Sequence, residues 1–336
     1  MLHSPLTRGR GMQRVPAPRL LGIDGGGTKT TAAVGNARGA IAGRGSAGAS
    51  NPTKVGLEAA GREILRAARA ALRQAGVERG GLDAVCLGLA GADRPDVRRP
   101  LLRWLRRAVP ARAHLLTTDA AIALEAALGQ RPGIIVIAGT GSIAYARDKQ
   151  GRMLRAGGWG VPFGDQGSGY DLGRKGVSAA LRAHDGEGPS TRLEAALCRA
   201  LHLRDITQVV GRNLKPQEPQ EIAALAPVVL DAARRGDPVA RALCQEAASD
   251  LASLALTLLR RLGLASPISV VVAGGVFQSS LSLRRSFARA VQRGVPTGGG
   301  GVRISLLGRP PVEGALALAQ LAARDQCLRR SGGSSR

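Results

Sequence analysis

The stretch Leu20-Leu21-Gly22-Ile23-Asp24-Gly25-Gly26-Gly27-Thr28-Lys29-Thr30 decides the fold of this chain. Its apolar beginning, together with Arg19 before it, predicts a buried strand at residues 19–23 that runs directly into a turn made of glycines. Apolar residues resume at 31–34, a turn follows at Gly35-Asn36, and a third short strand is expected at 40–43. Strand, glycine turn, strand, turn and strand is the order of a β-meander.

Helices and strands are then expected to alternate. Residues 57–75 have helical periodicity, with Leu57, Ile64 and Leu72 on one face and arginines on another. The remaining elements of this first half are expected as strands at 82–89 and 114–118 and as helices at 98–108 and 120–128.

The same order of elements then begins again. An apolar strand at 133–138 ends in Gly139-Thr140-Gly141-Ser142, and we expect two further strands at 143–147 and 153–156. A helical region at 170–263 includes a helix that starts at Asp237-Pro238, and it is followed by strands at 269–273 and 303–307 and a helix at 313–323. A β-β-β-α-β-α-β-α core thus occurs twice. This predicts an α/β protein of two lobes with a cleft between them, where the strand ends would hold ligands.

Composition excludes several classes of protein. With 336 residues and 44% hydrophobic residues, the chain can bury a large core. No apolar run approaches the roughly 18 residues of a membrane span, so we expect no membrane partner. The Arg- and Pro-rich residues 1–18 do not resemble a secretory signal and are expected to form a disordered extension. The dispersed cysteines form no CxxC pair, which argues against a zinc finger or disulfide scaffold and favours the cytoplasm.

The net charge of +24 raises the question of nucleic-acid binding. Only five of the 48 basic residues are lysines, arginines occur along the whole chain, and aromatic residues make up only 2%. We therefore interpret the charge as a solvated basic surface and expect no nucleic-acid partner. A nucleic-acid-binding ATPase remains an alternative that a lack of DNA binding at moderate salt would exclude.

The first glycine turn carries residue types that bind phosphate. Gly25, Gly26 and Gly27 would bring backbone N–H groups close to phosphate oxygens, and Thr28 and Lys29 add a hydroxyl and a positive charge. Asp24 could hold Mg²⁺ through water. The alternative is a glycine-rich hairpin turn without a ligand. The stretch is not a Walker A loop, because Thr28 separates Gly27 from the lysine.

The second glycine turn, Gly139, Thr140, Gly141 and Ser142, continues into Ile143-Ala144 and so matches the letters G-x-G-x-x-A. The dinucleotide fingerprint of that form requires a helix to follow, whereas residues 143–147 are expected to be a strand. We therefore prefer a second phosphate-binding turn to a Rossmann site.

Asp119, in Thr117-Thr118-Asp119-Ala120-Ala121, has two interpretations. It could cap the helix at 120–128, or it could be a general base, because it lies between the two glycine turns in the sequence.

Residues 157–170 contain six glycines together with Trp159, Asp165 and Tyr170, a composition that core packing does not require. A carboxylate among glycines beside an aromatic ring suits a sugar, and the alternative is an irregular loop between domains. Gly274 and Gly275 follow a strand and could let an adenosine ring approach the backbone. A strand followed by a glycine turn is by itself only weak evidence for such a site. Asn51 precedes Pro52 and could either start a turn or reach a sugar.

Taken in order, these motifs resemble the N-acetylglucosamine kinases. This group lies within the superfamily of sugar kinases, actin and heat-shock chaperones, and the resemblance covers about residues 19–325. The same family includes bacterial glucosamine kinases and the ATPases that activate benzoyl-CoA reductase and 2-hydroxyglutaryl-CoA dehydratase. Those activators carry cysteines near a Gly-Thr-Gly turn, and this chain has no cysteine near residue 140.

The resemblance implies a role for each motif. Asp119 matches the catalytic base, which would also bind the sugar, and Asn51 and Asp165 match sugar-binding positions. Gly158 and Trp159 lie in the same sugar loop. The two glycine turns match the ATP phosphate loops, and Gly274 with Gly275 the adenosine turn. Ala156 stands where some kinases carry Cys, and Gln166 where Glu is common, so the identity of the amino sugar stays open.

The resemblance thus implies an ATP- and Mg²⁺-dependent kinase that phosphorylates the C6 hydroxyl of N-acetylglucosamine. Glucosamine or N-acetylmuramic acid are alternative substrates, and an ATPase that activates a dehydratase or reductase is an alternative function. The implied assembly is a homodimer. The implied organisation is two actin-like ATPase lobes of the ribonuclease H-like type, at 19–119 and 120–311, a helix at 312–328 that packs back on the first lobe, and a disordered tail at 329–336.

Overall fold

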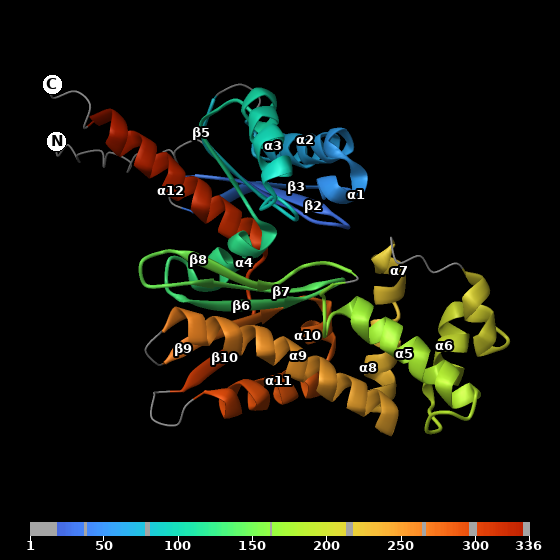
Figure 1. Cartoon of the computed structure of the whole chain (residues 1–336). Helices are drawn as coiled ribbons and strands as arrows, with labels where there is room; N and C mark the ends of the chain where they lie inside the picture. The colour runs from blue at the N-terminus through green and yellow to red at the C-terminus, as the bar shows by residue number, and fades with distance from the viewer. Residues whose placement is uncertain are drawn as a thin grey trace, which may run out of the picture. The chain divides into compact units, whose positions relative to one another are not determined.

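The computed structural model describes residues 19–36, 39–77, 81–161, 163–212, 218–263, 267–295 and 301–331 (Figure 1). The chain divides into two compact units: unit 1 is Met1–Leu116 with Leu316–Arg336, and unit 2 is Thr117–Ala315. The extension expected at residues 1–18 and the end of the expected tail lie outside the described residues. The lobe boundaries given above remain predictions.

Unit 1 is built on a mixed five-stranded sheet of order β3-β2-β1-β4-β5. The first strand pairs antiparallel with β2 and parallel with β4, as a hairpin followed by a crossover requires. Its elements are β1 (Leu20–Gly25), β2 (Thr30–Gly35), β3 (Ile41–Ala47), α1 (Pro52–Val55), α2 (Leu57–Gln74), β4 (Leu82–Leu89), α3 (Pro95–Ala108) and β5 (Ala111–Thr117).

Unit 2 contains a second five-stranded sheet, of order β10-β9-β6-β7-β8. The strand β6 pairs antiparallel with β7 and parallel with β9. The elements of the sheet and of the helix before it are α4 (Asp119–Leu128), β6 (Gly133–Ala138), β7 (Ser142–Arg147), β8 (Met153–Gly157), β9 (Ile268–Ala273) and β10 (Val302–Leu306). The other elements of unit 2 are α5 (Gly169–His184), α6 (Leu193–Leu201), η1 (Ile206–Arg212), α7 (Pro219–Ala223), α8 (Ala226–Arg234), α9 (Pro238–Leu262), α10 (Gly275–Ser279) and α11 (Leu281–Gly294). The last helix, α12 (Pro311–Ser331), starts in unit 2 and belongs to unit 1 from Leu316 onward.

The two sheets have the same topology. In each, the first strand of the unit lies between its hairpin partner and the fourth strand, and the third and fifth strands are the edges. The duplicated α/β core predicted from the sequence is therefore confirmed. The strands β1 and β4 run parallel, and so do β6 and β9. The turns that follow the two strands of each pair therefore lie at the same end of their sheet, beyond the carboxyl ends of the strands.

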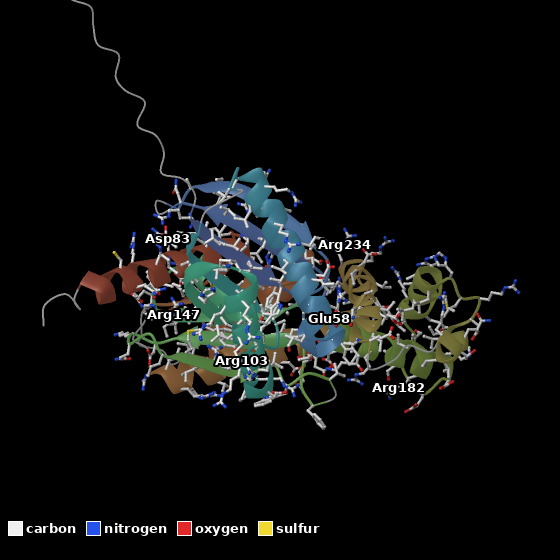
Figure 2. All side chains as sticks on the ribbon, turned by 90° about the horizontal axis from the view of Figure 1, so that it is seen from above. Glu58, Asp83, Arg103, Arg147, Arg182 and Arg234 are labelled. Carbon is white, nitrogen blue, oxygen red and sulfur yellow. The ribbon has the colours of Figure 1, made fainter. Side chains whose placement is uncertain are left out.

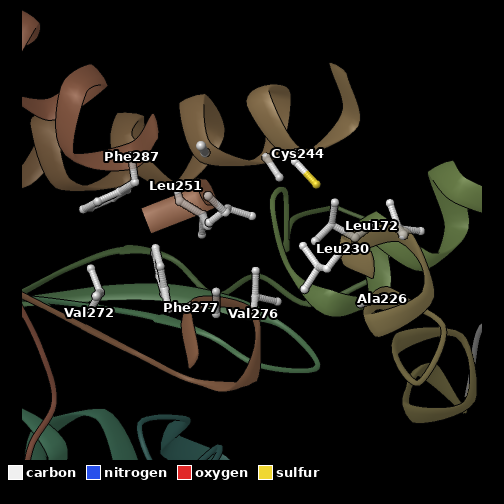
Figure 3. Packing of buried hydrophobic residues seen from close by; sticks show 14 of the residues in the cluster. Leu172, Ala226, Leu230, Cys244, Leu251, Val272, Val276, Phe277 and Phe287 are labelled. Carbon is white, nitrogen blue, oxygen red and sulfur yellow. The ribbon is translucent and has the colours of Figure 1, made fainter. Parts of the chain in front are cut away.

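The strands of unit 2 bury side chains on both faces of the sheet. Val136 and Val272 belong to a core formed with α5, α8, α9 and α11, whereas Ile135 and Val271 face the smaller core under α4. Phe277 and Phe287 meet edge to face, with ring centroids 5.2 Å apart (Figure 3). Burial on both faces explains why these strands are continuously apolar in the sequence.

A buried ion pair fixes α4 to the sheet of unit 2. Arg147 of β7 contacts Glu125 of α4 at 2.8 Å, and the two side chains are 7% and 3% exposed. The same guanidinium donates to the carbonyl of Gly129, and Gln130 donates to the Glu125 carboxylate at 2.7 Å. Arg147 and the exposed Arg234 are labelled in Figure 2. Helix α4 carries Asp119 at its first position, so this pair also holds the helix that presents a candidate catalytic residue.

Several elements differ from the sequence-based expectation in extent. The strand expected at 40–43 continues to Ala47, because its glycines pair with β2 instead of ending the strand. Leu57 was expected on the core face of α2 but is 39% exposed, whereas Ile64 is buried as predicted. The helices α10 and α11 were not predicted, and Ser280 caps α11 by accepting a hydrogen bond from the N–H of Leu283 at 3.2 Å. Helix α12 continues to Ser331, into the segment expected to be a tail.

Among the described residues, no helix is both long enough and apolar enough to span a membrane.

The buried pair yields a stability prediction. We expect Arg147→Ala to lower the free energy of unfolding by about 3–5 kcal/mol, because Glu125 would remain as an uncompensated buried charge. Arg234→Ala, which removes an exposed partner of Asp231, should cost less than about 1 kcal/mol. Guanidinium unfolding followed by circular dichroism measures both. Equal losses in the two variants would contradict the assigned role of the pair.

The start of α9 yields a pH prediction. Burial alone would raise the pKa of Asp237, but hydrogen bonds from the backbone N–H groups of Ala240 and Arg192 and from Thr191 outweigh burial and lower the pKa. A lowered pKa in the folded state stabilises the fold above the unfolded-state value of about 3.9, and this contribution is lost as the pH falls below it. We expect Asp237→Asn to lack this acid-sensitive part of the stability. Urea titrations between pH 3 and pH 7 test it, and parallel pH curves for both proteins would refute it.

Candidate functional site

The second glycine turn joins β6 to β7 in unit 2. The N–H of Gly139 donates to the carbonyl of Gly141 at 2.9 Å, and Ala138 pairs with Ser142 at the end of the hairpin. A strand therefore follows this turn, as predicted, and a Rossmann fingerprint is excluded. Ser142 is 3% exposed.

The described residues 157–161 and 163–168, named here the Trp159 loop, lie against the second glycine turn. The N–H of Gly158 donates to the carbonyl of Ser142 at 3.0 Å. The hydroxyl of Ser142 donates to the carbonyl of Gln166 at 2.8 Å. The N–H of Gly169, just beyond the loop, donates to the carbonyl of Gly139 at 2.8 Å. The second glycine turn and the Trp159 loop, which are predicted from the sequence to bind a phosphate and a sugar, are thus joined by hydrogen bonds.

Asp165 lies at the centre of this contact. Its Oδ1 accepts a hydrogen bond from the N–H of Ser142 at 3.0 Å, and the residue is 8% exposed. Its φ of 67° is in the left-handed region, which non-glycine residues adopt rarely. A Cβ atom on Gly141 would lie 2.8 Å from the Asp165 carboxylate, so the glycine is required for this close approach.

A charged cluster anchors the end of the Trp159 loop. Asp171 accepts a hydrogen bond from the N–H of Gly167 at 3.0 Å and contacts Lys175 at 2.7 Å. Lys175 also reaches Glu246 of α9 at 2.9 Å. Burial alone would lower the pKa of Lys175, but Asp171 and Glu246 outweigh it and raise the pKa. Sequence analysis did not single out these residues, because only the fold brings α5 and α9 together.

The aromatic side chains of the Trp159 loop are exposed. Trp159 is 69% exposed and Phe163 is 85% exposed. The guanidinium of Arg155 stacks on the Trp159 ring, 4.4 Å from its centroid. Trp159 is therefore not a core residue, which agrees with the sequence argument that packing does not account for this loop.

Gly274 and Gly275 follow β9 beside the end of β6. Gly274 has a φ of 96°, and a Cβ atom there would lie 2.2 Å from the carbonyl oxygen of Ala138. A Cβ on Gly275 or on Gly139 would meet no atom within 4 Å. The protein's own packing therefore does not require glycine at these two positions, which leaves open space beside the backbone at neighbouring strand ends. Open space alone is not specific, because Gly81, Gly211 and Gly308 share it.

Asp119 is not the cap of α4. The N-cap is Thr118, whose hydroxyl accepts a hydrogen bond from the N–H of Ala121 at 3.1 Å. Asp119 occupies the first helical position, is half-buried, and accepts a hydrogen bond from the N–H of Ala120 at 2.9 Å. The capping interpretation is thus wrong, and the carboxylate lies in the first turn of the helix, at the positive end of its dipole.

The first glycine turn lies at the end of β1 in unit 1. Asp24 is still within β1 and half-buried, whereas Thr28 and Lys29 are exposed in the turn. The carbonyl of Gly26 accepts a hydrogen bond from the N–H of Ser50 at 3.0 Å, so the segment before Asn51 lies beside the turn. The sequence-predicted residues of unit 1 are therefore brought together.

Asn51 caps the short helix α1. Its Oδ1 accepts hydrogen bonds from the N–H of Thr53 at 3.0 Å and from the Thr53 hydroxyl at 2.8 Å. The Nζ atom of Lys54 lies 3.4 Å from where a Cβ of Gly27 would be. Sequence analysis missed this cation at the first glycine turn, because nothing in the sequence between them indicates that Lys54 lies beside Gly27.

The described residues contain no group of three or more His, Cys, Asp or Glu that could hold a metal ion. Magnesium does not need such a group, because it keeps several waters and takes one or two carboxylates. The carboxylate of Asp24, at the end of β1 beside the glycines, is a hard oxygen donor that fits this ion.

Basic side chains are spread over the helices of both units in Figure 2. This distribution agrees with a solvated basic surface.

Comparison with known proteins defines the class. A crystal structure of a candidate N-acetylglucosamine kinase from Chromobacterium violaceum is similar, with a TM-score of 0.75, 30% identity, and coverage of 90% of this chain and 100% of that one. The fold is that of the actin-like ATPase sugar kinases.

Residues 21–316 match the model of the BadF/BadG/BcrA/BcrD ATPase family, and the chain belongs to that family. An N-acetylmuramic acid/N-acetylglucosamine kinase of Clostridium acetobutylicum is 33% identical, over 82% of this chain and 91% of that protein. A glucosamine kinase of Vibrio cholerae is 32% identical, over 69% of this chain and 77% of that protein. The resemblance inferred from the ordered motifs is thereby confirmed, and membership of an ATPase family supports ATP as a ligand.

The two neighbouring glycines after β9 yield a contrasting prediction. Gly274→Ala should destabilise the protein by at least about 2 kcal/mol, because its positive φ and the Ala138 carbonyl both oppose a side chain. Gly275→Ala should change the stability by less than about 0.5 kcal/mol. Thermal unfolding of both variants measures the difference, and a Gly274→Ala protein as stable as Gly275→Ala would contradict the packing described here.

Proposed function

We propose that this chain is an ATP-dependent amino-sugar kinase that transfers the γ-phosphate to the C6 hydroxyl of N-acetylglucosamine. The observation that carries the proposal is the hydrogen-bonded contact between the second glycine turn and the Trp159 loop, at Ser142 and Asp165. A loop that packs on a phosphate-binding turn is suited to holding an acceptor next to the phosphate. The family and its sugar kinase relatives support the same conclusion.

Each part of the site has a proposed task. The glycine turns at 24–30 and 139–142 would direct backbone N–H groups to the phosphates, and Lys54 would add a positive charge to the first turn. Gly274 and Gly275 would let the adenosine lie against the backbone. When bound, Mg²⁺ would neutralise charge on the phosphates, held through water by Asp24.

The acceptor would be held by the Trp159 loop and by Asn51. The carboxylate of Asp165 and the carbonyl of Gly158 would accept hydrogen bonds from sugar hydroxyls, with Trp159 at the rim. Asp119, half-buried at the first position of α4, would accept the proton of the attacking hydroxyl. Phosphoryl transfer needs mainly this positioning and charge stabilisation.

The relatives are named as kinases of different amino sugars. We propose N-acetylglucosamine as the substrate, and glucosamine and N-acetylmuramic acid are the alternatives. An assay of ADP release across a panel of hexoses and amino sugars separates these substrates. A 6-deoxy analogue of the best sugar should give no sugar-dependent ADP release. If the analogue is phosphorylated, the C6 hydroxyl is not the acceptor.

A second candidate is an ATPase that activates a reductase or dehydratase. It would hydrolyse ATP equally well without any sugar, so the same assay run without acceptor distinguishes it. The glycine-rich, aromatic Trp159 loop favours the kinase. The homodimer and the cytoplasmic location implied by the resemblance are proposals that sedimentation and cell fractionation test.

The proposed base yields a mutational prediction. Asp119→Asn should lower kcat by about 10²–10⁴-fold while ADP binding is retained, because the variant removes proton acceptance but leaves the glycine turns intact. Asp185→Asn, at an exposed position after α5, is the matched control and should have normal turnover. Near-normal turnover in Asp119→Asn would remove this residue from the mechanism.

A further inference from the structure

Asp165 has a second task that its proposed role at the sugar does not cover. The N–H of Ser142 that it binds belongs to the second glycine turn, the proposed phosphate-binding turn. The bond is buried, since Ser142 is 3% and Asp165 is 8% exposed. A buried N–H that loses its acceptor is costly, so the turn depends on this carboxylate for its conformation.

The backbone of Asp165 shows that this contact is specifically maintained. Its left-handed φ of 67° is unfavourable for a residue with a side chain, and such conformations persist only where the surroundings hold them. Gly141 supplies the space, because any Cβ there would lie within 2.9 Å of the carboxylate carbon. A strained aspartate and a glycine that makes room for it thus form a matched pair.

Further hydrogen bonds around this pair hold the second glycine turn to the Trp159 loop and to the start of α5. The Ser142 hydroxyl donates to the carbonyl of Gln166, and the Ser142 carbonyl accepts from the N–H of Gly158. At the other end of the turn, the N–H groups of Gly169 and Tyr170 donate to the carbonyls of Gly139 and Thr140. A displacement of the Trp159 loop therefore moves the backbone of the turn.

We infer that Asp165 couples the two substrates of the enzyme: its carboxylate sets the affinity of the second glycine turn for nucleotide, and a sugar that binds this carboxylate strengthens nucleotide binding. The inference rests on the proposed function. A carboxylate accepts about four hydrogen bonds, so one group can serve the Ser142 N–H and a sugar hydroxyl together. A sugar that holds Asp165 in place holds the turn in place, and by linkage the nucleotide strengthens sugar binding by the same factor.

The first test measures nucleotide binding without sugar. Calorimetric titration with ADP and Mg²⁺ compares the wild type with Asp165→Ala and Asp165→Asn. We expect the Kd for ADP to rise by about three- to thirtyfold in Asp165→Ala, a part of what one charged hydrogen bond supplies. The rise should be smaller in Asp165→Asn, because its amide oxygen can still accept from Ser142. Thermal unfolding establishes that both variants are folded.

Trp159→Ala is the matched control. It alters another residue that the proposal assigns to the sugar, in the same loop, but one whose exposed side chain contacts Arg155 rather than the turn. It should raise the KM for sugar and leave the sugar-free Kd for ADP unchanged. An equal loss of ADP affinity in Trp159→Ala would overturn the inference, because any disturbance of the loop would then have the same effect.

The second test uses Gly141→Ala, which displaces the carboxylate without altering Asp165. If both changes act through the Ser142 bond, their effects on ADP affinity are not additive in the Gly141→Ala/Asp165→Ala double variant. Additive effects would overturn the inference. Adding the best sugar should lower the Kd for ADP in the wild type but not in Asp165→Ala.

The outcomes also separate the inference from the proposed function. A wild type that binds no ADP would refute the proposed function itself. A wild type that binds ADP and phosphorylates sugar, with unchanged sugar-free ADP affinity in folded Asp165→Ala, would refute the coupling alone.

Discussion

The hydrogen bond from the Ser142 N–H to the Asp165 carboxylate is the contact on which the arrangement of the site depends. It joins the turn after β6 to the Trp159 loop, and it requires both a glycine at 141 and a left-handed aspartate at 165. Ser142 makes two further bonds at the same place, to Gln166 and Gly158. A site whose parts are bonded in this way is preorganised, which phosphoryl transfer needs more than it needs covalent chemistry.

The sheets supply the fixed frame for these parts. In each unit two adjacent parallel strands end on the same side of their sheet. The loops that follow these two strands are therefore neighbours in space although they are far apart in the sequence. The buried Glu125–Arg147 pair extends this frame to α4 and thus to Asp119. Of the proposed site residues, Asn51 and Asp165 lie on loops, Asp119 at a helix start and Asp24 near the end of β1.

Local sequence patterns predicted most of the elements and all of the glycine motifs. The hairpin that excludes a Rossmann site could be read from Ile143–Arg147 and the turn after it, because strand alternation and turn residues act over a few positions. The same reasoning placed the start of α9 at Asp237-Pro238. It missed α11, although Ser280 is a typical cap and Phe287 lies on a buried face. It ended β3 too early, because glycines in an edge strand look like a turn.

The sequence by itself thus determined the class of fold and the repeated order of elements, since both rest on residues near one another in the chain, whereas the roles of the motifs stay predictions. The tertiary structure decided which groups share a contact. Thr118 rather than Asp119 caps α4, Lys54 lies beside Gly27, and Lys175 joins Asp171 to Glu246. It also decided that Asp165 binds the backbone of Ser142. The physical reason is that hydrogen bonds and ion pairs act over a few ångströms in space, and only the folding of the sheets brings residues so far apart in the chain to that distance.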